Sequence, residues 1–258
     1  MAEVFYTPSH DLHEFDLLPG RILRSNKPEL IDLSSSLRAY RHGEEDPLYR
    51  IRVALVSAAM QCISGTPDNV GSNLAMYRFT GGAGVVNCTQ PIDREVAFVT
   101  RLREAGTNII PVAINTHDYK EKVPALVDAG ANLFIADTSQ GWSDYQKETI
   151  AFVKQEYRDI PIWGGNIVSG DGFYFLVEEC GADAVKVGMG VGAGCITQEV
   201  LGVARKQATA IQAVARARNE YRERTGIYVP IISDGGVKTF SDIPKAHAFG
   251  ADIIMVGR

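Results

Sequence analysis

The stretch that decides the fold runs from NLFIAD (132–137) through a helical pattern over 143–157 to IPIWGG (160–165). Its two ends are short continuous apolar runs, which are typical of strands buried on both faces of a parallel sheet. The middle segment opens at Ser143, a favourable helix cap, and repeats apolar residues at helical spacing. We therefore predict a strand, a helix and a second, parallel strand.

The same alternation extends outward from this unit in both directions. Further helical patterns occupy 91–105 and 198–225, the second predicted to be the longest helix. The other apolar runs are VALVSAAM (53–60), GVVN (84–87), NIIPVAI (108–114), DAVKVG (183–188), VPIISDGG (229–236) and DIIMVG (252–257). Eight strands alternating with helices predict an α/β fold, the eight-stranded parallel (β/α)₈ or TIM barrel. A doubly wound sheet shares the alternation, but no GxGxxG follows the first run, which disfavours its dinucleotide-binding form.

The pattern divides the chain into two parts. Residues 1–50 carry Pro, Asn and Ser punctuation without a strong period, and we expect an extended arm there, with a short hairpin. Residues 51–258 form the predicted catalytic barrel. The sequence stops directly after the eighth predicted strand, without a last outer helix, so we expect a fragment or further residues beyond it.

Composition and charge narrow the classes of function. A net charge of −5 argues against nonspecific binding of nucleic acid, which needs a basic surface. No signal-peptide pattern and no apolar run of membrane-spanning length occurs, so we expect a cytoplasmic protein without a membrane partner. The four cysteines form no CxxC pair, which disfavours a zinc site or a thioredoxin-like motif.

The loop after the sixth predicted strand is rich in glycine. In GMGVGAGCIT (188–197), four glycines allow positive φ angles and let the backbone approach a ligand closely before the chain reaches Cys195. A thiolate is a strong nucleophile at near-neutral pH. The residues alone leave two interpretations open, a reactive thiol or a flexible loop with an incidental buried cysteine.

The loops after the last two predicted strands suit a phosphorylated ligand. Asp234 can accept two hydrogen bonds from the vicinal hydroxyls of a ribose, and Gly235 and Gly236 expose backbone amides to a phosphate. Gly257 and Arg258 add a close-approach glycine and a cation. Asp-Gly-Gly taken singly is more often a turn, but phosphate binding by these two adjacent loops recurs in TIM barrels.

Three more loops offer groups to a ligand. Asp137, Thr138 and Ser139 are suited to the ribose or amide of a second ligand, or to capping the next helix. Asn166 offers an amide beside two glycines. Met60 is suited to the wall of a site for a flat base, with a core methionine as the alternative.

Several of these motifs together resemble the IMP dehydrogenase and GMP reductase family, from Phe15 to Arg258. The most specific parts are Val187-Gly188-Met189-Gly190 through Cys195-Ile196-Thr197-Gln198, and Ser233-Asp234-Gly235-Gly236. Leu55 to Met60 and Gly164-Gly165-Asn166 add weaker support. A match of several loops in the right order is more specific than any one of them.

The resemblance implies an oxidoreductase reaction in guanine nucleotide synthesis. Cys195 would attack C2 of IMP, hydride would pass to NAD⁺, and water would hydrolyse the thioimidate to xanthosine monophosphate, with Thr197 beside the thiol. The implied substrate contacts are Met60, Asn166, Gly192, Gly194, Asp234, Gly235, Gly236, Gly257 and Arg258. NAD contacts would be Asp137, Thr138, Ser139, Gly188 and Gly190. Carbonyls of Gly190, Gly192 and Cys195 would hold a potassium ion, and the assembly would be a homotetramer.

Three departures from the family's pattern matter. Ala193-Gly194-Cys195 stands where the family usually has Ser-Ile-Cys, so a phosphate-binding hydroxyl is missing. Residues 104–108 cross directly the point where a tandem cystathionine-β-synthase-type (CBS) pair is usually inserted. The mobile flap with its water-activating Arg-Tyr pair would lie beyond the eighth predicted strand. For a chain that ended at Arg258, we would expect covalent chemistry without efficient turnover.

Other functions stay open at this stage. GMP reductase, which deaminates GMP with NADPH, is the main alternative. The missing CBS pair leans towards it, whereas the 137–141 loop and Gln198 favour the dehydrogenase. A nucleotide-binding protein that has lost catalysis is a further possibility, and a flavin-dependent barrel shares the phosphate loops.

Overall fold

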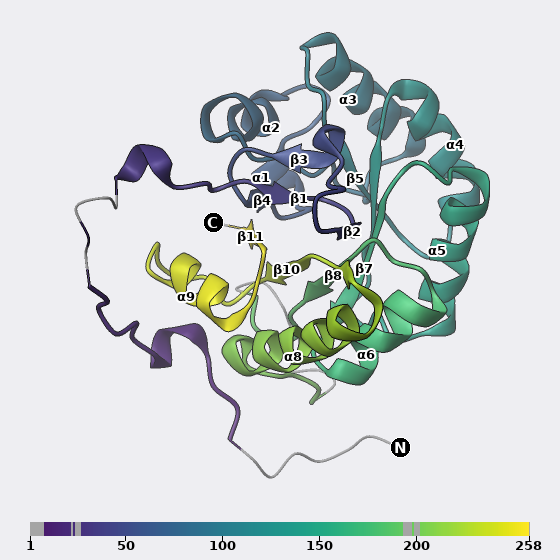
Figure 1. The fold of residues 1–258 in the computed structure, drawn as a ribbon. Coiled ribbons are helices and arrows are strands. Elements are labelled where there is room, and N and C mark those ends of the chain that lie inside the picture. Colours follow the sequence, from purple (N-terminus) through teal and green to yellow (C-terminus); the bar gives the residue numbers. More distant parts are fainter. Residues whose placement is uncertain (1–7, 22, 24–26, 193–197, 199–201, 258) are drawn as a thin grey trace.

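The centre of the molecule is a curled parallel sheet (Figure 1). The structure, a computed structural model, describes residues 8–21, 23, 27–192, 198 and 202–257. Within these ranges the sheet has seven parallel strands in the order β4-β11-β10-β8-β7-β6-β5. They are β4 (Leu55–Ser57), β5 (Pro111–Ile114), β6 (Leu133–Ala136), β7 (Ile162–Ile167), β8 (Ala184–Val187), β10 (Ile231–Asp234) and β11 (Ile253–Val256). Each strand falls in or on a predicted apolar run, so the α/β class and the parallel sheet are confirmed.

The predicted strand at 84–87, the second along the sequence, is not a regular strand in the structure. Among the described residues, this segment makes one parallel bridge to β4, between Ala83 and Val56, and one to β5, between Val86 and Val112. The backbone changes partner between these two positions, so no ladder continues along either neighbour. The prediction of eight regular strands was therefore only partly right.

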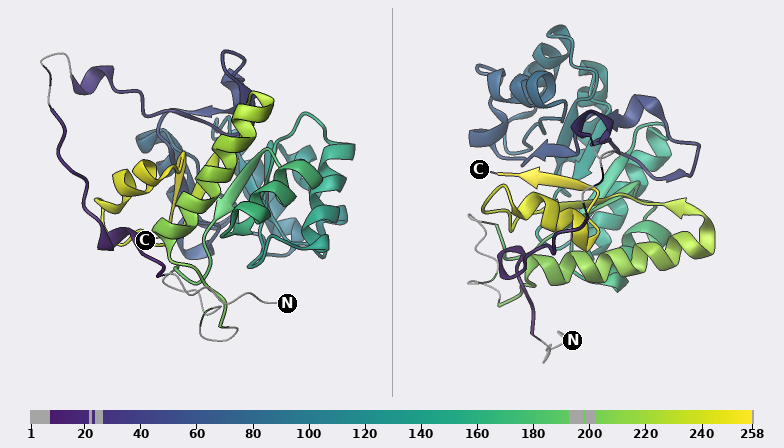
Figure 2. Two further views of the ribbon diagram at one scale, coloured as in Figure 1. Left: turned by 60° about the horizontal axis from the view of Figure 1, so that its bottom comes forward. Right: turned by 60° about the vertical axis from the view of Figure 1, so that its left-hand side comes forward.

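Helices surround the sheet on its outer side (Figures 1 and 2). They are α1 (Gln61–Ser64), α2 (Gly71–Ala75), α3 (Ile92–Glu104), α4 (Tyr119–Ala129), α5 (Asp144–Glu156), α6 (Gly170–Tyr174), α8 (Gln207–Thr225) and α9 (Asp242–Phe249). Single π-helical turns, η4 (Met76–Thr80) and η5 (Phe175–Glu179), continue α2 and α6. Ser143 caps α5 as predicted, since its side chain accepts a hydrogen bond from Gln146 N. None of the helices in the described ranges is long and apolar enough to cross a bilayer.

The helix predicted over 198–225 is interrupted: Gln198 is helical, but the long helix α8 begins only at Gln207. Gly202 has a φ of 67°, and Arg205 N donates to Met189 O across an antiparallel bridge. Residues 202–206 therefore run beside the loop after β8 instead of continuing a helix. α8 starts at Gln207 and ends before Gly226, which is left-handed as predicted.

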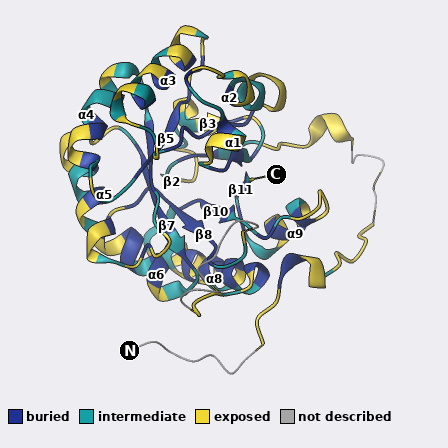
Figure 3. Cartoon of the chain, turned by 180° about the vertical axis from the view of Figure 1, so that it is seen from behind, coloured by how far each residue is buried: buried dark blue, intermediate teal, exposed yellow. Residues whose placement is uncertain are grey.

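Strand side chains alternate between two apolar clusters, one on each face of the sheet. In β6, Phe134 and Ala136 pack with the surrounding helices, whereas Leu133 and Ile135 belong to a cluster on the sheet's inner face. Figure 3 shows the strands buried and the outer faces of the helices exposed. This two-sided burial explains why the strands are apolar throughout.

The described residues before 51 form only short regular elements, joined by extended segments that run around the sheet (Figure 2). Single 3₁₀ turns are η1 (Leu12–Glu14), η2 (Pro28–Leu30) and η3 (Pro47–Tyr49), and the short strands are β1 (Ser35–Ser36), β2 (Tyr40–Arg41) and β3 (Arg50–Ile51). β1 pairs with β3, and β2 pairs with β9 (Ile227–Tyr228), both antiparallel. Leu37 is part of the inner cluster, and its carbonyl accepts a hydrogen bond from Trp163 Nε1 at 2.6 Å.

Candidate active site

A buried lysine joins the carboxyl ends of three strands. Lys186 lies in β8, is 2% exposed, and donates to Asp137 Oδ1 at 2.6 Å and to Asp234 Oδ2 at 3.0 Å. Asp137 directly follows β6 and Asp234 ends β10. A buried ammonium is tolerated only with such partners, so the lysine fixes these two carboxylates relative to each other.

Asn166 connects the same group to β7. Its Nδ2 donates to Asp234 Oδ2 at 2.9 Å and to Gly188 O at 2.7 Å, while its buried Oδ1 has no partner among the described residues. Asp137 Oδ2 and Asp234 Oδ1 also lack partners in the described part of the chain, and the two side chains are 31% and 24% exposed. Each carboxylate is thus held through one oxygen, and its other oxygen has no partner among the described residues.

The electrostatics keep this group charged. Burial by itself would raise the pKa of Asp234, but the ammonium of Lys186 and the hydrogen bond from Asn166 hold that pKa below its usual value. Burial would lower the pKa of Lys186, but Asp137 and Asp234 raise it well above its usual value. Asp234 and Lys186 are therefore both charged at neutral pH.

These shifts predict how stability depends on pH. The pKa of Asp234 is lower in the folded protein, so its stabilising contribution is present above the ordinary value of 3.8 and is lost as pH falls below it. The raised pKa of Lys186 gives a contribution that is present below 10.5 and is lost as pH rises further. Urea unfolding should therefore show a stability difference between wild type and Asp234→Asn that is constant near neutral pH and shrinks below 3.8. A difference unchanged at lower pH would contradict this assignment.

Two glycines let the loops around this group approach closely. A Cβ at Gly188, whose φ is 149°, would lie 1.9 Å from Asp234 O. A Cβ at Gly165, whose φ is 156°, would lie 2.5 Å from the Cβ of Lys186. Gly188 was predicted to contact the cofactor. In the structure, the absence of a side chain at Gly188 lets the loop after β8 pack against the end of β10.

Gly188→Ala is expected to destabilise the fold by about 1–3 kcal/mol, because the added Cβ meets backbone in a conformation that alanine avoids. Thermal or urea unfolding measures this loss. Gly181→Ala is a matched control, since Gly181 also has a positive φ, 78°, but no atom within 4 Å of an added Cβ. Equal losses in the two variants would show that the backbone conformation, not the contact with Asp234, sets the cost.

The glycine-rich loop after β8 lies against the loop after β10. Gly236 N donates to Val191 O at 3.3 Å, and an added Cβ at Gly235 would come within 3.2 Å of Gly192 N. The carbonyls of Gly188, Met189 and Val191 accept hydrogen bonds within the protein. Those of Gly190 and Gly192 have no such partner among the described residues.

The predicted wall and framework residues are also placed. Met60 is 43% exposed, and its sulfur lies 3.8 Å from an added Cβ at Gly257, so the ends of β4 and β11 meet there. Ser139 is exposed. The hydroxyl of Thr138 lies 3.0 Å from both Gly165 O and Gln146 Oε1, which ties the loop after β6 to β7. Thr138 therefore has a framework role in the structure, and its contact with a cofactor stays a prediction.

Four predicted site residues lie outside the described residues: Gly194, Cys195, Thr197 and Arg258. The described chain reaches Gly192 on one side of the predicted nucleophile, and Gly192 lies beside Gly235. The roles assigned to Cys195 and Thr197 therefore stay predictions from the sequence.

Sequence reasoning missed two residues that organise the site. Lys186 stood inside an apolar run, DAVKVG, and a lysine in a strand buried on both faces is a signal that partners must exist. Gln207, the first residue of α8, is fully buried and donates to Val187 O at 2.8 Å and to Ser233 Oγ at 2.9 Å. No pattern in the sequence distinguishes Gln207 from other polar helix residues.

Comparison with known proteins assigns the fold and site to a family. The sequence model of the IMP dehydrogenase / GMP reductase domain matches residues 13–258. This chain belongs to the IMP dehydrogenase / GMP reductase family. The described strand ends that carry Asp137, Lys186 and Asp234 all lie inside the matched range.

Individual family members are similar over more than half of the chain. An inosine-5'-monophosphate dehydrogenase of Tritrichomonas foetus is 47% identical over 151 residues, which is 58% of this chain and 30% of that protein. The Aquifex aeolicus protein of the same name is 39% identical over 155 residues, 60% of this chain and 30% of its own length. Inosine-5'-monophosphate dehydrogenase 2 of Arabidopsis thaliana is 40% identical over 150 residues, 58% of this chain and 28% of its own length. The matched region thus spans less than a third of each of these family members.

Proposed function

We propose that this chain is the catalytic barrel of an IMP dehydrogenase, which oxidises IMP to xanthosine monophosphate with NAD⁺ in guanine nucleotide synthesis. The observation that carries the proposal is the pair of carboxylates at the ends of β6 and β10, linked by Lys186. Each side chain is partly exposed and has one oxygen without a partner among the described residues. Two such acceptors side by side suit two riboses, one of the substrate and one of a dinucleotide.

Asp234 is the proposed anchor of the IMP ribose. Its low pKa keeps it ionised, so its free oxygen accepts charge-assisted hydrogen bonds from the ribose hydroxyls. Gly235 and Gly236, with φ angles of 94° and 75°, turn the backbone after it towards the place proposed for the phosphate. Gly257 and Arg258 complete the proposed phosphate site, and Met60 forms a wall for the base.

The residues present fit a dinucleotide on the β6 side. We propose that Asp137 holds the nicotinamide ribose through its free oxygen, and that Ser139, which is exposed, contributes beside it. Bound NAD⁺ supplies the hydride acceptor. Lys186 keeps Asp137 and Asp234 at a fixed separation, so the two riboses would be held in one relative position.

Cys195 is the proposed nucleophile. Its thiolate forms a bond to C2 of IMP while the hydrogen on C2 leaves as hydride, which gives a thioimidate. Water then adds to C2, and the bond from C2 to sulfur breaks. A proton from the water is transferred to the Cys195 sulfur, with Thr197 beside it. The open carbonyls of Gly190 and Gly192 suit a monovalent cation, potassium, that would fix the loop before the nucleophile.

Mass spectrometry after incubation with IMP and NAD⁺ tests this proposal without requiring turnover. The chain is expected to carry one nucleotide adduct, absent from Cys195→Ala and retained by Cys62→Ala, because Cys62 is also a free thiol and is exposed. An adduct formed only from GMP, with release of ammonia, would instead make the chain a GMP reductase. Tight binding of IMP with no adduct from either nucleotide would indicate a binding protein that has lost catalysis.

We also propose the organisation that the resemblance implies. Residues 1–50 are the arm and 51–258 the barrel, in which 83–86 closes the ring between β4 and β5 as an irregular eighth strand. α3 passes to β5 through 105–110 without a CBS pair. A homotetramer would cover apolar side chains that the arm exposes: Leu18, Leu30, Ile31 and Leu33. A cytoplasmic location would keep the nucleophilic thiol reduced.

A further inference from the structure

A cavity lies at the opposite end of the sheet from the proposed active site. Its volume is about 610 Å³, which is within the range of small-molecule sites. Asn108 and Ile109 precede β5 and Asn132 precedes β6, so these residues lie at the amino ends of the strands. Asp137 and Asp234 lie at the carboxyl ends of parallel strands, so the cavity is separate from their site.

The lining of this cavity is cationic. Arg50, Arg52 and Arg78 line it, and no aspartate or glutamate does. This is unusual in a chain whose net charge is −5. Among the described residues, Arg52 and Arg78 have no carboxylate within ion-pair distance; Arg78 donates to Ala105 O, and Arg50 pairs with the exposed Asp32 at 3.1 Å. Three guanidinium groups with little local compensation favour an anion.

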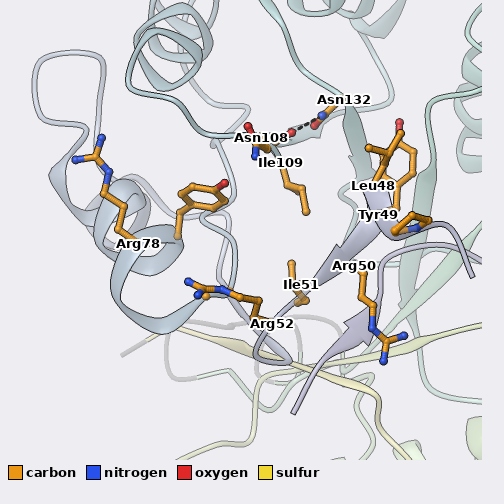
Figure 4. A pocket seen from close by; sticks show the side chains of 13 residues that line it. Leu48, Tyr49, Arg50, Ile51, Arg52, Arg78, Asn108, Ile109 and Asn132 are labelled. Carbon is orange, nitrogen blue, oxygen red and sulfur yellow. Dashed lines mark hydrogen bonds between the residues drawn. The ribbon is translucent and has the colours of Figure 1, made fainter. Parts of the chain in front are cut away.

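The centre of the cavity is apolar and aromatic. Figure 4 shows Ile51 and Ile109 facing each other across it, with the three arginines around its edge. Both isoleucines belong to the buried inner cluster, so this floor is fixed by the core. Tyr49 and Tyr77 also line the cavity and add rings against which a flat group can stack.

The backbone of Arg52 is hydrogen-bonded to the segment that precedes 83–86. Gly81 O accepts hydrogen bonds from Arg52 N at 3.0 Å and from Val53 N at 3.3 Å. Gly82 packs so closely on β4 that an added Cβ would lie 2.1 Å from Leu55 O. The stem of Arg52 is thus attached to the sheet, and a preformed site costs less ordering on binding.

We infer that this cavity binds a phosphorylated small molecule with a flat ring, the chemistry of a nucleotide. The phosphates would pair with the arginines at the edge, and the ring would lie between the isoleucines and the tyrosines. The cavity is a site separate from that of the substrate in the proposed reaction, because it lies at the other end of the strands. An effector that binds here would act through the sheet.

Titration of the full chain with ATP tests the inference. Inorganic tripolyphosphate and adenosine are titrated separately, because they carry the phosphates and the ring of ATP, respectively. In spectra of methyl-labelled protein, ATP is expected to shift the resonances of Ile51 and Ile109 and to leave that of Ile211 on α8 unchanged. Calorimetry should show ATP binding more tightly than either half. Shifts confined to residues near Asp234, or tripolyphosphate binding as tightly as ATP, would overturn the inference.

Charge-neutral variants provide the matched comparison. Arg52→Gln and Arg78→Gln are each expected to weaken ATP binding about tenfold, the loss of one charge-assisted contact. Arg216→Gln removes the same charge from an exposed position on α8 that does not line the cavity, and it should leave binding unchanged. Thermal unfolding shows whether each variant is folded. Equal affinity in all three variants would contradict the site.

Discussion

Lys186→Met is expected to destabilise the fold by about 3–5 kcal/mol, because it leaves the carboxylates of Asp137 and Asp234 without their shared cation in a buried setting. Methionine keeps most of the length of the lysine stem, so the loss would come from the charge and not from a cavity. Urea unfolding measures the effect. Nucleotide binding should weaken in parallel, since the two carboxylates would no longer be held relative to each other.

Lys147→Met is the matched control for this prediction. Lys147 pairs with Glu179 at 3.1 Å, but both side chains are about half exposed, so its loss should reduce the stability far less than the loss of Lys186. Similar losses in the two variants would contradict the central role given to Lys186. The double variant Lys186→Met, Asp234→Asn should recover part of the stability, because it also removes one of the two unpaired charges.

Asp234→Asn is expected to weaken IMP binding by about a hundredfold, because an amide replaces the carboxylate that would accept two charge-assisted hydrogen bonds from the ribose. The side-chain oxygen of asparagine can still accept from Lys186 and Asn166, so the fold should persist. Calorimetric titration with IMP measures the change. Asp144→Asn, an exposed carboxylate at the start of α5, should bind IMP like the wild type. Unchanged affinity in Asp234→Asn would remove this residue from the proposed site.

Much of the fold follows from local signals in the sequence. Each of the seven strands overlaps a short apolar run. Because the strands are buried on both faces, their residues are apolar almost without interruption, which distinguishes them from helices with a polar outer face. Helix ends were also readable, since Ser143 caps α5 and left-handed glycines end α4 and α8. These features depend on neighbours within a few residues.

The errors occur where distant parts of the chain decide the structure. Val86 and Ala83 pair with different strands, which the run GVVN does not reveal. The helix predicted over 198–225 has an alanine-rich composition, yet residues 202–206 bond to the loop after β8 instead. In both cases a tertiary contact overrides the local propensity.

The candidate site shows the same division. Asp137, Asn166 and Asp234 could be selected because each stands at the end of a predicted strand, where TIM-barrel sites lie. The lysine that joins them could not be paired with them from spacing, because its partners lie 49 and 48 residues away. Gly188 and Thr138 were selected as ligand contacts, but their visible interactions hold loops together.

The pairing of β4 with β11 has a consequence for how the chain folds during synthesis. β4 is the first strand of the sheet in the sequence and β11 the last, yet they are neighbours. One edge of β4 therefore stays unpaired and apolar during synthesis until β11 has left the ribosome. Such an edge is a site of aggregation, so nascent chains stopped before β11 should need chaperones to stay in solution.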